Sequence, residues 1–370
     1  MNPDLIVVGA GIVGLAHALE GVRRGLKVTV IERDHRCVGA SIRNFGFITV
    51  TGQPAGDTWR RARVSRDVWV EVATQANIPI EHRGLWMIAH RPLAAEVLQA
   101  FMRTSMAHGN RLLDAAAAGR EAPELQLDGA HAVMHSPHEV RVESRQAIAR
   151  LAAWLVERHG VQFLFGEAVL EVEAPRVRTS QRTLHAERVV ICPGTELNGV
   201  GSESLASFGL KLTRLQMLRV KPQSGFRLSA AVMSDLSLVR YGGYAALAEA
   251  AALKTQLVEE EGPSLEAGIH LIVVQSADGS LVIGDSHHTF DTPEPFAFDD
   301  VDELIMAHAS KALKLTQSRI IERWTGVYPT GGPGDCLIRA PDSRTRVVVV
   351  TSGTGASTGF GIAREVFDAW

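Results

Sequence analysis

The stretch DLIVVGAGIVGLAHALEGVRRGLKVTVIER, residues 4–33, decides the fold. An apolar run at 4–8 leads into a glycine turn. A segment with apolar residues at helical spacing follows, and a second apolar run ends at Glu32. This order predicts a β-strand, an α-helix and a second, parallel β-strand, which together form a βαβ unit.

The glycine turn and the acidic residue after the second strand predict a dinucleotide site. Gly9, Gly11 and Gly14 form G-x-G-x-x-G between a strand and a helix. At these positions glycine permits a tight turn, close approach to a pyrophosphate and close packing of the helix on the strand. The helix start then faces the anion. Glu32 can accept hydrogen bonds from both ribose hydroxyls and repels a 2′-phosphate, which argues against NADP.

Three later segments favour FAD over NAD. The loop SIRNFG, 41–46, can wrap a pyrophosphate and reach an isoalloxazine, and the strand in ERVVICPGTEL, 187–197, ends in a turn that allows close backbone passage. GTGASTGFGIA, 353–363, follows another strand and gives a second helix start, which suits the anionic pyrimidine edge of a reduced flavin. Two helix starts fit the two ends of a flavin nucleotide, whereas NAD needs one.

Nucleotide-binding signals at both ends of the chain and near Cys192 predict a discontinuous domain. A chain of 370 residues exceeds one ordinary core, so we expect two lobes. The predicted fold class is α/β, with a Rossmann-like FAD-binding domain and an α+β substrate domain on a mostly antiparallel sheet. The predicted ranges are 1–80, 140–212 and 320–370 for the FAD-binding domain and 81–139 and 213–319 for the substrate domain.

Local patterns predict several further elements. We expect a helix at 57–77, another from about 93 to 118, a helix at 144–160 capped by Ser144, and a hairpin at the turn ADGS, 277–280. The segment 39–53 is predicted as a loop, because it is rich in Gly, Ser, Thr and Asn.

Composition excludes several classes of protein. The net charge is −3 and no run of Lys or Arg occurs, so nucleic acid is not expected as a partner. Three scattered cysteines indicate neither a disulfide framework nor a zinc site, and we expect no metal. The odd number of cysteines suits a reducing compartment, so we expect a cytoplasmic location. We also expect no signal peptide and no membrane span.

The order of these motifs resembles the D-amino-acid oxidase and glycine oxidase superfamily of FAD enzymes. The matching segments are SIRNFG, ERVVICPGTEL, LTRLQMLRV, GSLVIGDSH, RWTGVYP and GTGASTGFGIA. The resemblance implies oxidation of the C–N bond of a small amine. GASIRNFGFITVTGQ together with WTGVYP is most similar to a bacterial branch associated with aminophosphonate catabolism. That branch implies a substrate like 2-aminoethylphosphonate or its N-methyl derivative.

The glycine turns and this resemblance together define the expected cofactor site. We expect FAD to be held non-covalently by Gly9, Gly11, Ile12, Val13, Gly14, Glu32, Arg33, Ser41, Arg43, Asn44, Phe45, Gly46, Ala168, Val169, Pro193, Gly194, Gly326, Gly353, Gly355, Ala356, Ser357 and Thr358.

The substrate site departs from the family pattern. Relatives commonly carry an arginine near the WxGxxP segment that clamps a carboxylate, but Val327 and Tyr328 stand there in this chain. An α-amino acid substrate is therefore in doubt, with Arg323 and Arg339 as alternative clamps. We expect a phosphonate to be bound by the donors Arg43, Thr49, Arg240, Tyr241, His287, His288 and Tyr328. Only one of the two consecutive histidines is expected to face the site.

The expected mechanism is hydride transfer from carbon to flavin N5, assisted mainly by orientation of a neutral amine, and no catalytic side chain is assigned. The electron acceptor is oxygen or another oxidant. One alternative is an oxidase or dehydrogenase of glycine, sarcosine or a D-amino acid. Others are an NAD-linked dehydrogenase and a flavin-bearing RNA-modification or sensor module, which predicts a basic face or an added domain.

Overall fold

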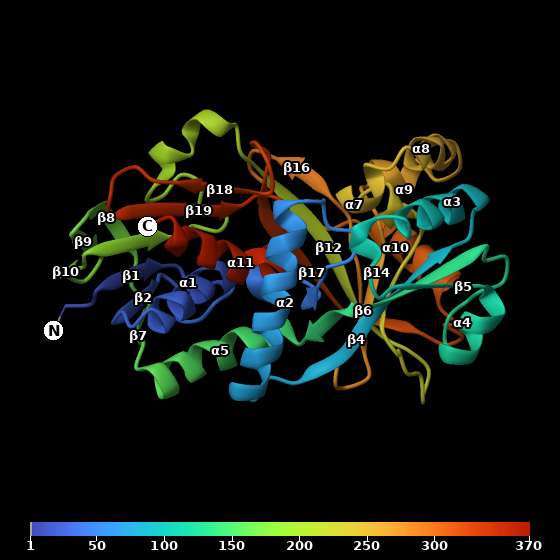
Figure 1. Cartoon of the computed structure of the whole chain (residues 1–370), viewed down its shortest axis with the longest axis horizontal. Coiled ribbons are helices and arrows are strands. Elements are labelled where there is room, and N and C mark those ends of the chain that lie inside the picture. Colours follow the sequence, from blue (N-terminus) through green and yellow to red (C-terminus); the bar gives the residue numbers. More distant parts are fainter. Residues whose placement is uncertain (1) are drawn as a thin grey trace.

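A six-stranded sheet brings three separate parts of the chain together in the computed structural model, which describes residues 2–370 (Figure 1). The strands lie in the order β18, β19, β11, β1, β2, β7, and neighbours run parallel except β18 and β19. Their bounds are β1 Leu5–Val8, β2 Val28–Glu32, β7 Gln162–Phe165, β11 Arg188–Ile191, β18 Cys336–Arg339 and β19 Thr345–Val350. The predicted discontinuous Rossmann-like fold is confirmed.

Both faces of this sheet are buried. Leu5 and Val7 of β1 pack into the core under the helices, whereas Ile6 packs into a separate core on the opposite face. Alternate side chains of a strand point to opposite faces, which explains why the strand is apolar throughout. The elements around this sheet are α1 Ile12–Arg23, α2 Asp57–Gln75, α5 Ser144–His159, α11 Gly355–Asp368, β8 Val169–Glu173, β9 Arg176–Thr179 and β10 Thr183–His185.

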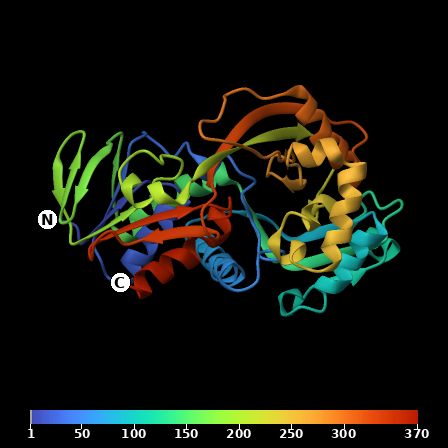
Figure 2. The same ribbon diagram turned by 90° about the horizontal axis from the view of Figure 1, so that it is seen from above.

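The second lobe is built on a ten-stranded sheet, seen beside the first in Figure 2. All its strand pairs are antiparallel except β13 with β4, as predicted for the substrate domain. The strands are β3 Phe47–Ile48, β4 Ile80–Ala89, β5 Arg111–Leu113, β6 Ala132–Val142, β12 Lys211–Lys221, β13 Ala231–Met233, β14 Ile272–Gln275, β15 Leu281–Gly284, β16 His288–Phe290 and β17 Arg319–Thr330.

Short helices surround this second sheet. They are α3 Pro92–Phe101, α4 Ala115–Glu121, α6 Asp235–Leu238, α7 Gly242–Ala245, α8 Glu249–Glu260, α9 Gly262–Glu266 and α10 Asp299–Ala312. The 3₁₀ turns of the chain are η1 Ala40–Ile42, η2 Ser105–Ala107, η3 Ser202–Ser204 and η4 Ala206–Phe208. Strand β17 pairs with β12 on the large sheet, although the proposed ranges assign 320–370 to the FAD-binding domain. The ranges themselves stay a proposal.

Three local predictions were wrong in part. The expected helix from about 93 to 118 is divided into α3, η2, β5 and α4, because Gly109 at φ 81° turns the chain and Asp114 caps a new helix. Ser144 does not cap α5: the N-cap is Glu143, and the Ser144 hydroxyl donates to the carbonyl of Asn44. The segment 39–53 is mainly loop but contains η1 and the two-residue strand β3.

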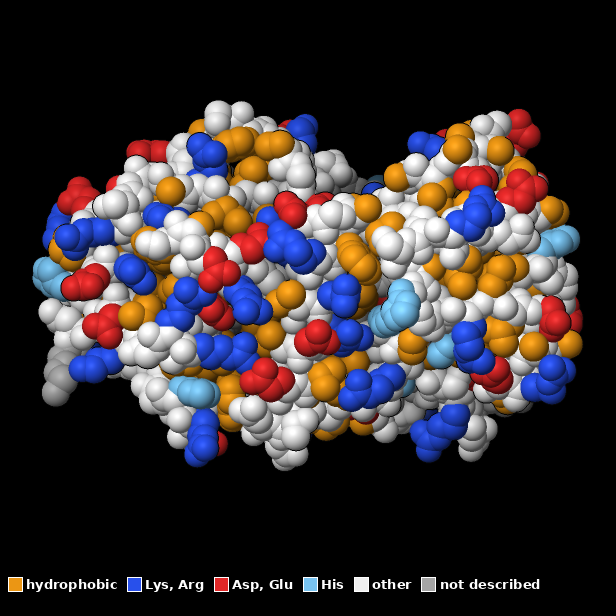
Figure 3. All heavy atoms as spheres, in the orientation of Figure 1, with side chains coloured by type: hydrophobic (Ala, Val, Ile, Leu, Met, Phe, Trp, Pro, Cys, Tyr) orange, Lys and Arg blue, Asp and Glu red, His pale blue; other side chains and the backbone are white. Residues whose placement is uncertain are grey.

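Charged side chains of one sign do not gather into a patch on the face of residues 2–370 drawn in Figure 3. Basic and acidic side chains are interspersed over both lobes, and a notch separates the lobes along the upper edge. Within residues 2–370, every helix is too short or too polar to cross a bilayer. The cytoplasmic location expected from the cysteine content stays a prediction.

Helices α2 and α11 join the first and last parts of the chain. The Trp69 indole nitrogen donates to the carbonyl of Ala356 at 2.8 Å, and the amide of Gly361 donates to the Ser65 hydroxyl at 2.9 Å. A Cβ at Gly361 would lie 2.7 Å from the backbone of Arg61, which is closer than real Cβ contacts allow. Glycine at this position therefore sets the distance between the two helices.

This packing gives a stability prediction. We expect Gly361→Ala to lower the free energy of unfolding by about 1–3 kcal/mol, because the helices must separate. Gly359→Ala on the same helix is the control. Its Cβ would meet its nearest neighbours at 3.9 Å, an ordinary contact, so helix propensity makes the change neutral or stabilising by up to about 1 kcal/mol. Thermal unfolding of both variants checks this, and equal effects would contradict it.

Candidate functional site

The two glycine turns face one cavity of about 440 Å³. Gly11–Gly14 at the start of α1 and Ser352–Ser357 at the start of α11 both line it. A Cβ at Gly355 would lie 3.7 Å from the side chains of Ile12 and Val13, so the two turns are in contact range of each other. Two helix N-termini, each a partial positive charge, therefore border the same space.

Close packing accounts for the glycines of the first turn. Gly9 has φ 100°, and a Cβ there would lie 2.5 Å from the carbonyl oxygen of Cys192. A Cβ at Gly14 would lie 1.9 Å from the carbonyl oxygen of Gly9. No side chain fits at either position, so the backbone itself forms the floor on which a pyrophosphate can lie.

Glu32 and Ser41 are already held at this turn. The Glu32 carboxylate accepts hydrogen bonds from the amides of Ala10, at 2.8 Å, and Asp34, at 3.1 Å. The Ser41 hydroxyl accepts from the amide of Ile12 at 2.9 Å. The loop after β2 thus lies across the helix start, and its polar groups are placed for the ribose and the phosphates of a dinucleotide.

Thr49 ties the N-terminal loop to the C-terminal helix. Its amide and hydroxyl lie 2.9 and 3.0 Å from the Ser357 hydroxyl, and the Gln53 side-chain amide donates to its hydroxyl at 2.6 Å. Thr49 was expected to bind substrate and does line the cavity, but its hydrogen-bonding groups are engaged within the protein. Its evident contribution is to fix the two ends of the chain around the cavity.

Another part of the cavity wall carries a cluster of aromatic and charged side chains. The Arg240 guanidinium donates to the Tyr328 hydroxyl at 3.5 Å, and the Tyr328 and His287 rings meet edge to face at 6.1 Å. A Cβ at Gly353 would lie 3.1 Å from the Tyr328 ring. Tyr328 therefore connects this cluster to the second glycine turn.

Two residues of this cluster, His270 and Asp285, were not expected from the sequence. Asp285 Oδ1 lies 3.4 Å from His270 Nε2, and Asp285 Oδ2 lies 3.8 Å from His287 Nε2. All three side chains line the cavity. The signal for Asp285 was available, since a charged residue directly follows the buried strand LVIG. His270 precedes an apolar strand and carries no such signal.

Burial controls the ionisation of this cluster. It raises the pKa of Asp285 to about 7, although the nearby Arg240 cation opposes that rise. Burial lowers the pKa of His270 to about 3 and that of His287 well below its usual value, with Arg240 adding to both effects. At neutral pH both imidazoles are therefore uncharged, and Asp285 lies near its midpoint.

Comparison with known proteins decides the family. Residues 4–369 match the family described as FAD dependent oxidoreductase. The chain belongs to this family. No curated protein sequence matches the chain. The cofactor is FAD, and the alternative of an NAD-linked dehydrogenase is set aside.

Solved structures show the same fold at low identity. Glycine oxidase from Bacillus cereus ATCC 14579 has a TM-score of 0.80 at 16% identity, covering 99% of this chain and 96% of that one. L-proline dehydrogenase from P. horikoshii has a TM-score of 0.79 at 16% identity, covering 99% and 92%. Iminodiacetate oxidase from Chelativorans sp. BNC1 has a TM-score of 0.73 at 16% identity, covering 98% and 94%.

The cavity of this FAD-dependent oxidoreductase collects many of the residues expected to bind cofactor or substrate. Those in its wall are Gly11, Ile12, Val13, Gly14, Ser41, Arg43, Asn44, Phe45, Thr49, Gly194, Arg240, Tyr241, His287, Gly326, Tyr328, Gly353, Gly355, Ala356 and Ser357. Those outside the wall are Gly9, Glu32, Arg33, Gly46, Ala168, Val169, Pro193, His288 and Thr358. Of the consecutive histidines, His287 lines the cavity and His288 pairs with Arg214 on β12.

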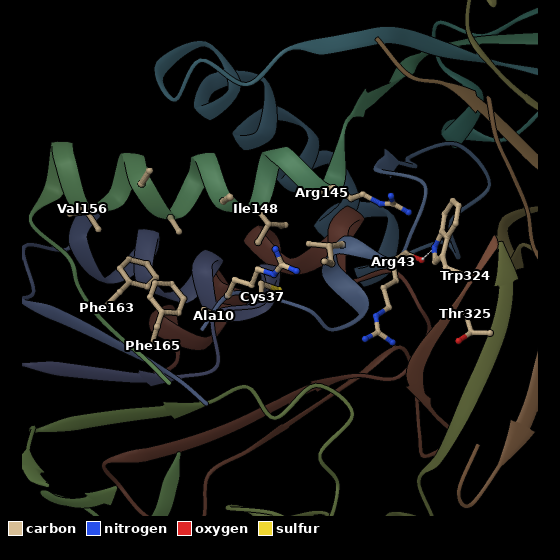
Figure 4. A pocket seen from close by; sticks show the side chains of 15 residues that line it. Ala10, Cys37, Arg43, Arg145, Ile148, Val156, Phe163, Phe165, Trp324 and Thr325 are labelled. Carbon is tan, nitrogen blue, oxygen red and sulfur yellow. Dashed lines mark hydrogen bonds between the residues drawn. The ribbon is translucent and has the colours of Figure 1, made fainter. Parts of the chain in front are cut away.

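A larger cavity of about 770 Å³ lies beside the first (Figure 4). Ile148 of α5 and the rings of Phe163 and Phe165 form much of its wall, and Arg43 and Trp324 lie at its other end. The Trp324 indole nitrogen donates to the Arg43 carbonyl at 3.1 Å. The lining of this larger cavity is mainly apolar and includes neither helix start. The smaller cavity is therefore the candidate active site of the enzyme.

The position of Glu32 gives a prediction for cofactor affinity. We expect Glu32→Gln to weaken FAD binding about 10-fold or more, because a charged acceptor for the ribose hydroxyls is lost. Asp34→Asn is the control, since the ion pair of this half-exposed carboxylate within residues 2–370 is the one with the neighbouring Arg33, at 3.7 Å. Flavin fluorescence after dilution measures FAD release, and equal retention by both variants would place the ribose elsewhere.

Proposed function

We propose that the enzyme oxidises the C–N bond of a small amine that carries an anionic group, producing an imine that hydrolyses to an aldehyde. The first candidates are 2-aminoethylphosphonate and its N-methyl derivative. The observation that carries this proposal is the Arg240–Tyr328 pair in the wall of the candidate active site. A cation and a hydroxyl in the wall of a flavin cavity provide a place for a substrate anion.

The surroundings of the pair support an anion other than a simple α-carboxylate. Val327 and Tyr328 line the cavity where relatives commonly carry an arginine. Arg323 instead pairs with Asp302 at 2.7 Å, and Arg339 lies over the Phe208 ring at 5.1 Å, so neither replaces it. A tetrahedral phosphonate accepts several single donors from different directions, and the phenols and the imidazole beside Arg240 can supply them.

The residues of the chain have defined tasks in this proposal. When bound, FAD supplies the acceptor for the hydride that leaves the carbon next to the nitrogen. The starts of α1 and α11 hold the two ends of the cofactor. Arg240 and Tyr328 orient the substrate by its anion, and the half-buried ring of Tyr241 in the cavity wall helps to keep water from the reacting carbon. Catalysis then depends chiefly on orientation.

Oxidation of a small amino acid such as glycine, sarcosine or a D-amino acid is the second candidate. One observation favours it: a single guanidinium such as that of Arg240 can bind a carboxylate through two parallel hydrogen bonds. The structural neighbours whose names give a substrate include a glycine oxidase and an iminodiacetate oxidase. Substrate tests separate the two candidates.

A substrate screen tests the proposed function. The enzyme is mixed anaerobically with glycine, sarcosine, D-alanine, 2-aminoethylphosphonate and N-methyl-2-aminoethylphosphonate, and loss of the visible flavin absorbance is followed. We expect the aminophosphonates to bleach the flavin fastest, because the Arg240–Tyr328 end of the cavity suits their anion. Bleaching by the amino acids alone would favour the second candidate, and no bleaching by any amine would reject amine oxidation.

Replacement of Arg240 tests the anion site. We expect Arg240→Gln to raise the apparent dissociation constant of the substrate about 10- to 100-fold, because charge-assisted hydrogen bonds are lost. The limiting rate of flavin reduction should change much less, since the reacting atoms are untouched. Arg339→Gln, outside the cavity, serves as the control. Rapid-mixing kinetics measure both quantities, and an unchanged dissociation constant would place the anion elsewhere.

A further inference from the structure

Asp285 is a buried carboxylate that the protein leaves largely uncompensated. Its side chain is 6% exposed, and its Oδ1 atom has no hydrogen-bond partner among the described residues. Within residues 2–370, its only contacts at ion-pair distance are with His270 and His287. Buried carboxylates are normally paired or hydrogen-bonded, so this group is arranged for a partner that enters the cavity.

The two histidines do not supply that partner. His287 Nδ1 lies 3.0 Å from the carbonyl oxygen of Gly268, which assigns the ring proton to Nδ1 and leaves a lone pair on the Nε2 atom that faces Asp285. A Cβ at Gly268 would lie 2.7 Å from that of His287, so the backbone of Gly268 packs directly against His287. Burial disfavours the cationic form of His270, and its Nε2 atom, 3.4 Å from Asp285 Oδ1, makes no hydrogen bond to that oxygen.

We infer that Asp285 receives the ammonium group of the substrate and takes its proton before oxidation. This inference rests on the proposed function and deepens it. Arg240 and Tyr328 offer positive charge and a donor in the same cavity, whereas Asp285 offers an acceptor. The active site is therefore built for a molecule with an ammonium group and an anionic group, and Asp285 is a catalytic residue.

The proton transfer balances as follows. An N–H bond of the ammonium breaks, its electron pair stays on nitrogen, and an O–H bond forms on the Asp285 carboxylate. The neutral amine can then lose a hydride from the adjacent carbon to the flavin of the family activity, and the nitrogen lone pair forms the C=N bond. The iminium product takes up water and separates into an aldehyde and an ammonium ion.

A bound metal ion is the competing occupant of this cluster. The ligand atoms of His270, Asp285 and His287 lie within 4.8 Å of one another, and two imidazoles with one carboxylate suit zinc. The Arg240 guanidinium, whose charge acts on all three groups, repels a divalent cation at this place about twice as strongly as a singly charged ammonium. An ammonium also carries one charge rather than two, which matches the single carboxylate.

The groups that face Asp285 determine the pH profile. They are His270 before β14, His287 after β15, Arg240 and Tyr241 between α6 and α7, and Tyr328 on β17. Both histidines lose their protons well below neutral pH, and burial raises the pKa of both tyrosines above its usual value. Asp285, with a pKa of about 7, is thus the group of this set that titrates near neutrality.

The test measures anaerobic flavin reduction by the amine that bleaches the wild-type enzyme best. The rate constant divided by the dissociation constant should rise with pH through about 7 in the wild type, as Asp285 loses its proton. In Asp285→Asn it should rise only near the pKa of the free amine, about 10. At pH 7 we expect a loss of about 100- to 1000-fold, which is largely recovered at pH 10.

The control variant is Asp278→Asn, on the exposed turn of the same hairpin, with a side chain 62% exposed. It should keep the pH profile of flavin reduction seen in the wild type.

A loss in Asp285→Asn that is equal at every pH would contradict proton transfer, as would zinc bound at one equivalent per chain in the purified wild type. If Asp285→Asn does not load FAD, the wild-type profile decides: a rise only near pH 10 overturns the inference. Absence of bleaching by any amine rejects the proposed function instead.

Discussion

The contact between the first and the last glycine turn is the constraint on which the rest of the structure depends. Gly355 lies so close to Ile12 and Val13 that an added Cβ would just touch their side chains. Strands β1 and β19 are separated only by β11, which sets the two helix starts side by side. Thr49, directly after β3, and Trp69 on α2 then hold the C-terminal turn through hydrogen bonds to Ser357 and Ala356. Each of these contacts serves to keep two helix N-termini around one cofactor.

The sequence was most informative where local signals and tertiary structure agree. The first βαβ unit, α2, α5 and the β14–β15 hairpin carry regular apolar spacing or a turn signature, and all are present. The region 93–118 shows the limit of that reasoning. Its many alanines suggest one helix, but Gly109 and Asp114 divide it, and β5 pairs with β6. Whether such a segment forms a helix or a strand depends on whether a sheet edge lies nearby to pair with it. A local sequence pattern does not contain that information.

In the candidate active site, too, residues marked by a local motif could be predicted, whereas contacts that depend on tertiary structure could not. Residues on the glycine turns could be predicted because a turn at the end of a parallel strand faces the ligand edge of the sheet. The approach of His270 to Asp285 could not, because the two residues meet only through the register of β14 and β15, which pairs Ile272 with Gly284. A shift of one residue would turn Asp285 out of the cavity. The alternation that separates His287 from His288 has the same origin.

The position of β19 in the sheet also affects how the protein is made. A ribosome delivers β1, β2, β7 and β11 long before residues 345–368, and until then β11 is an open edge with its apolar faces uncovered. Before these residues are made, the chain carries only the first of the two helix starts. The complete cofactor site therefore exists only once β19 has paired with β11 and α11 has docked on α1.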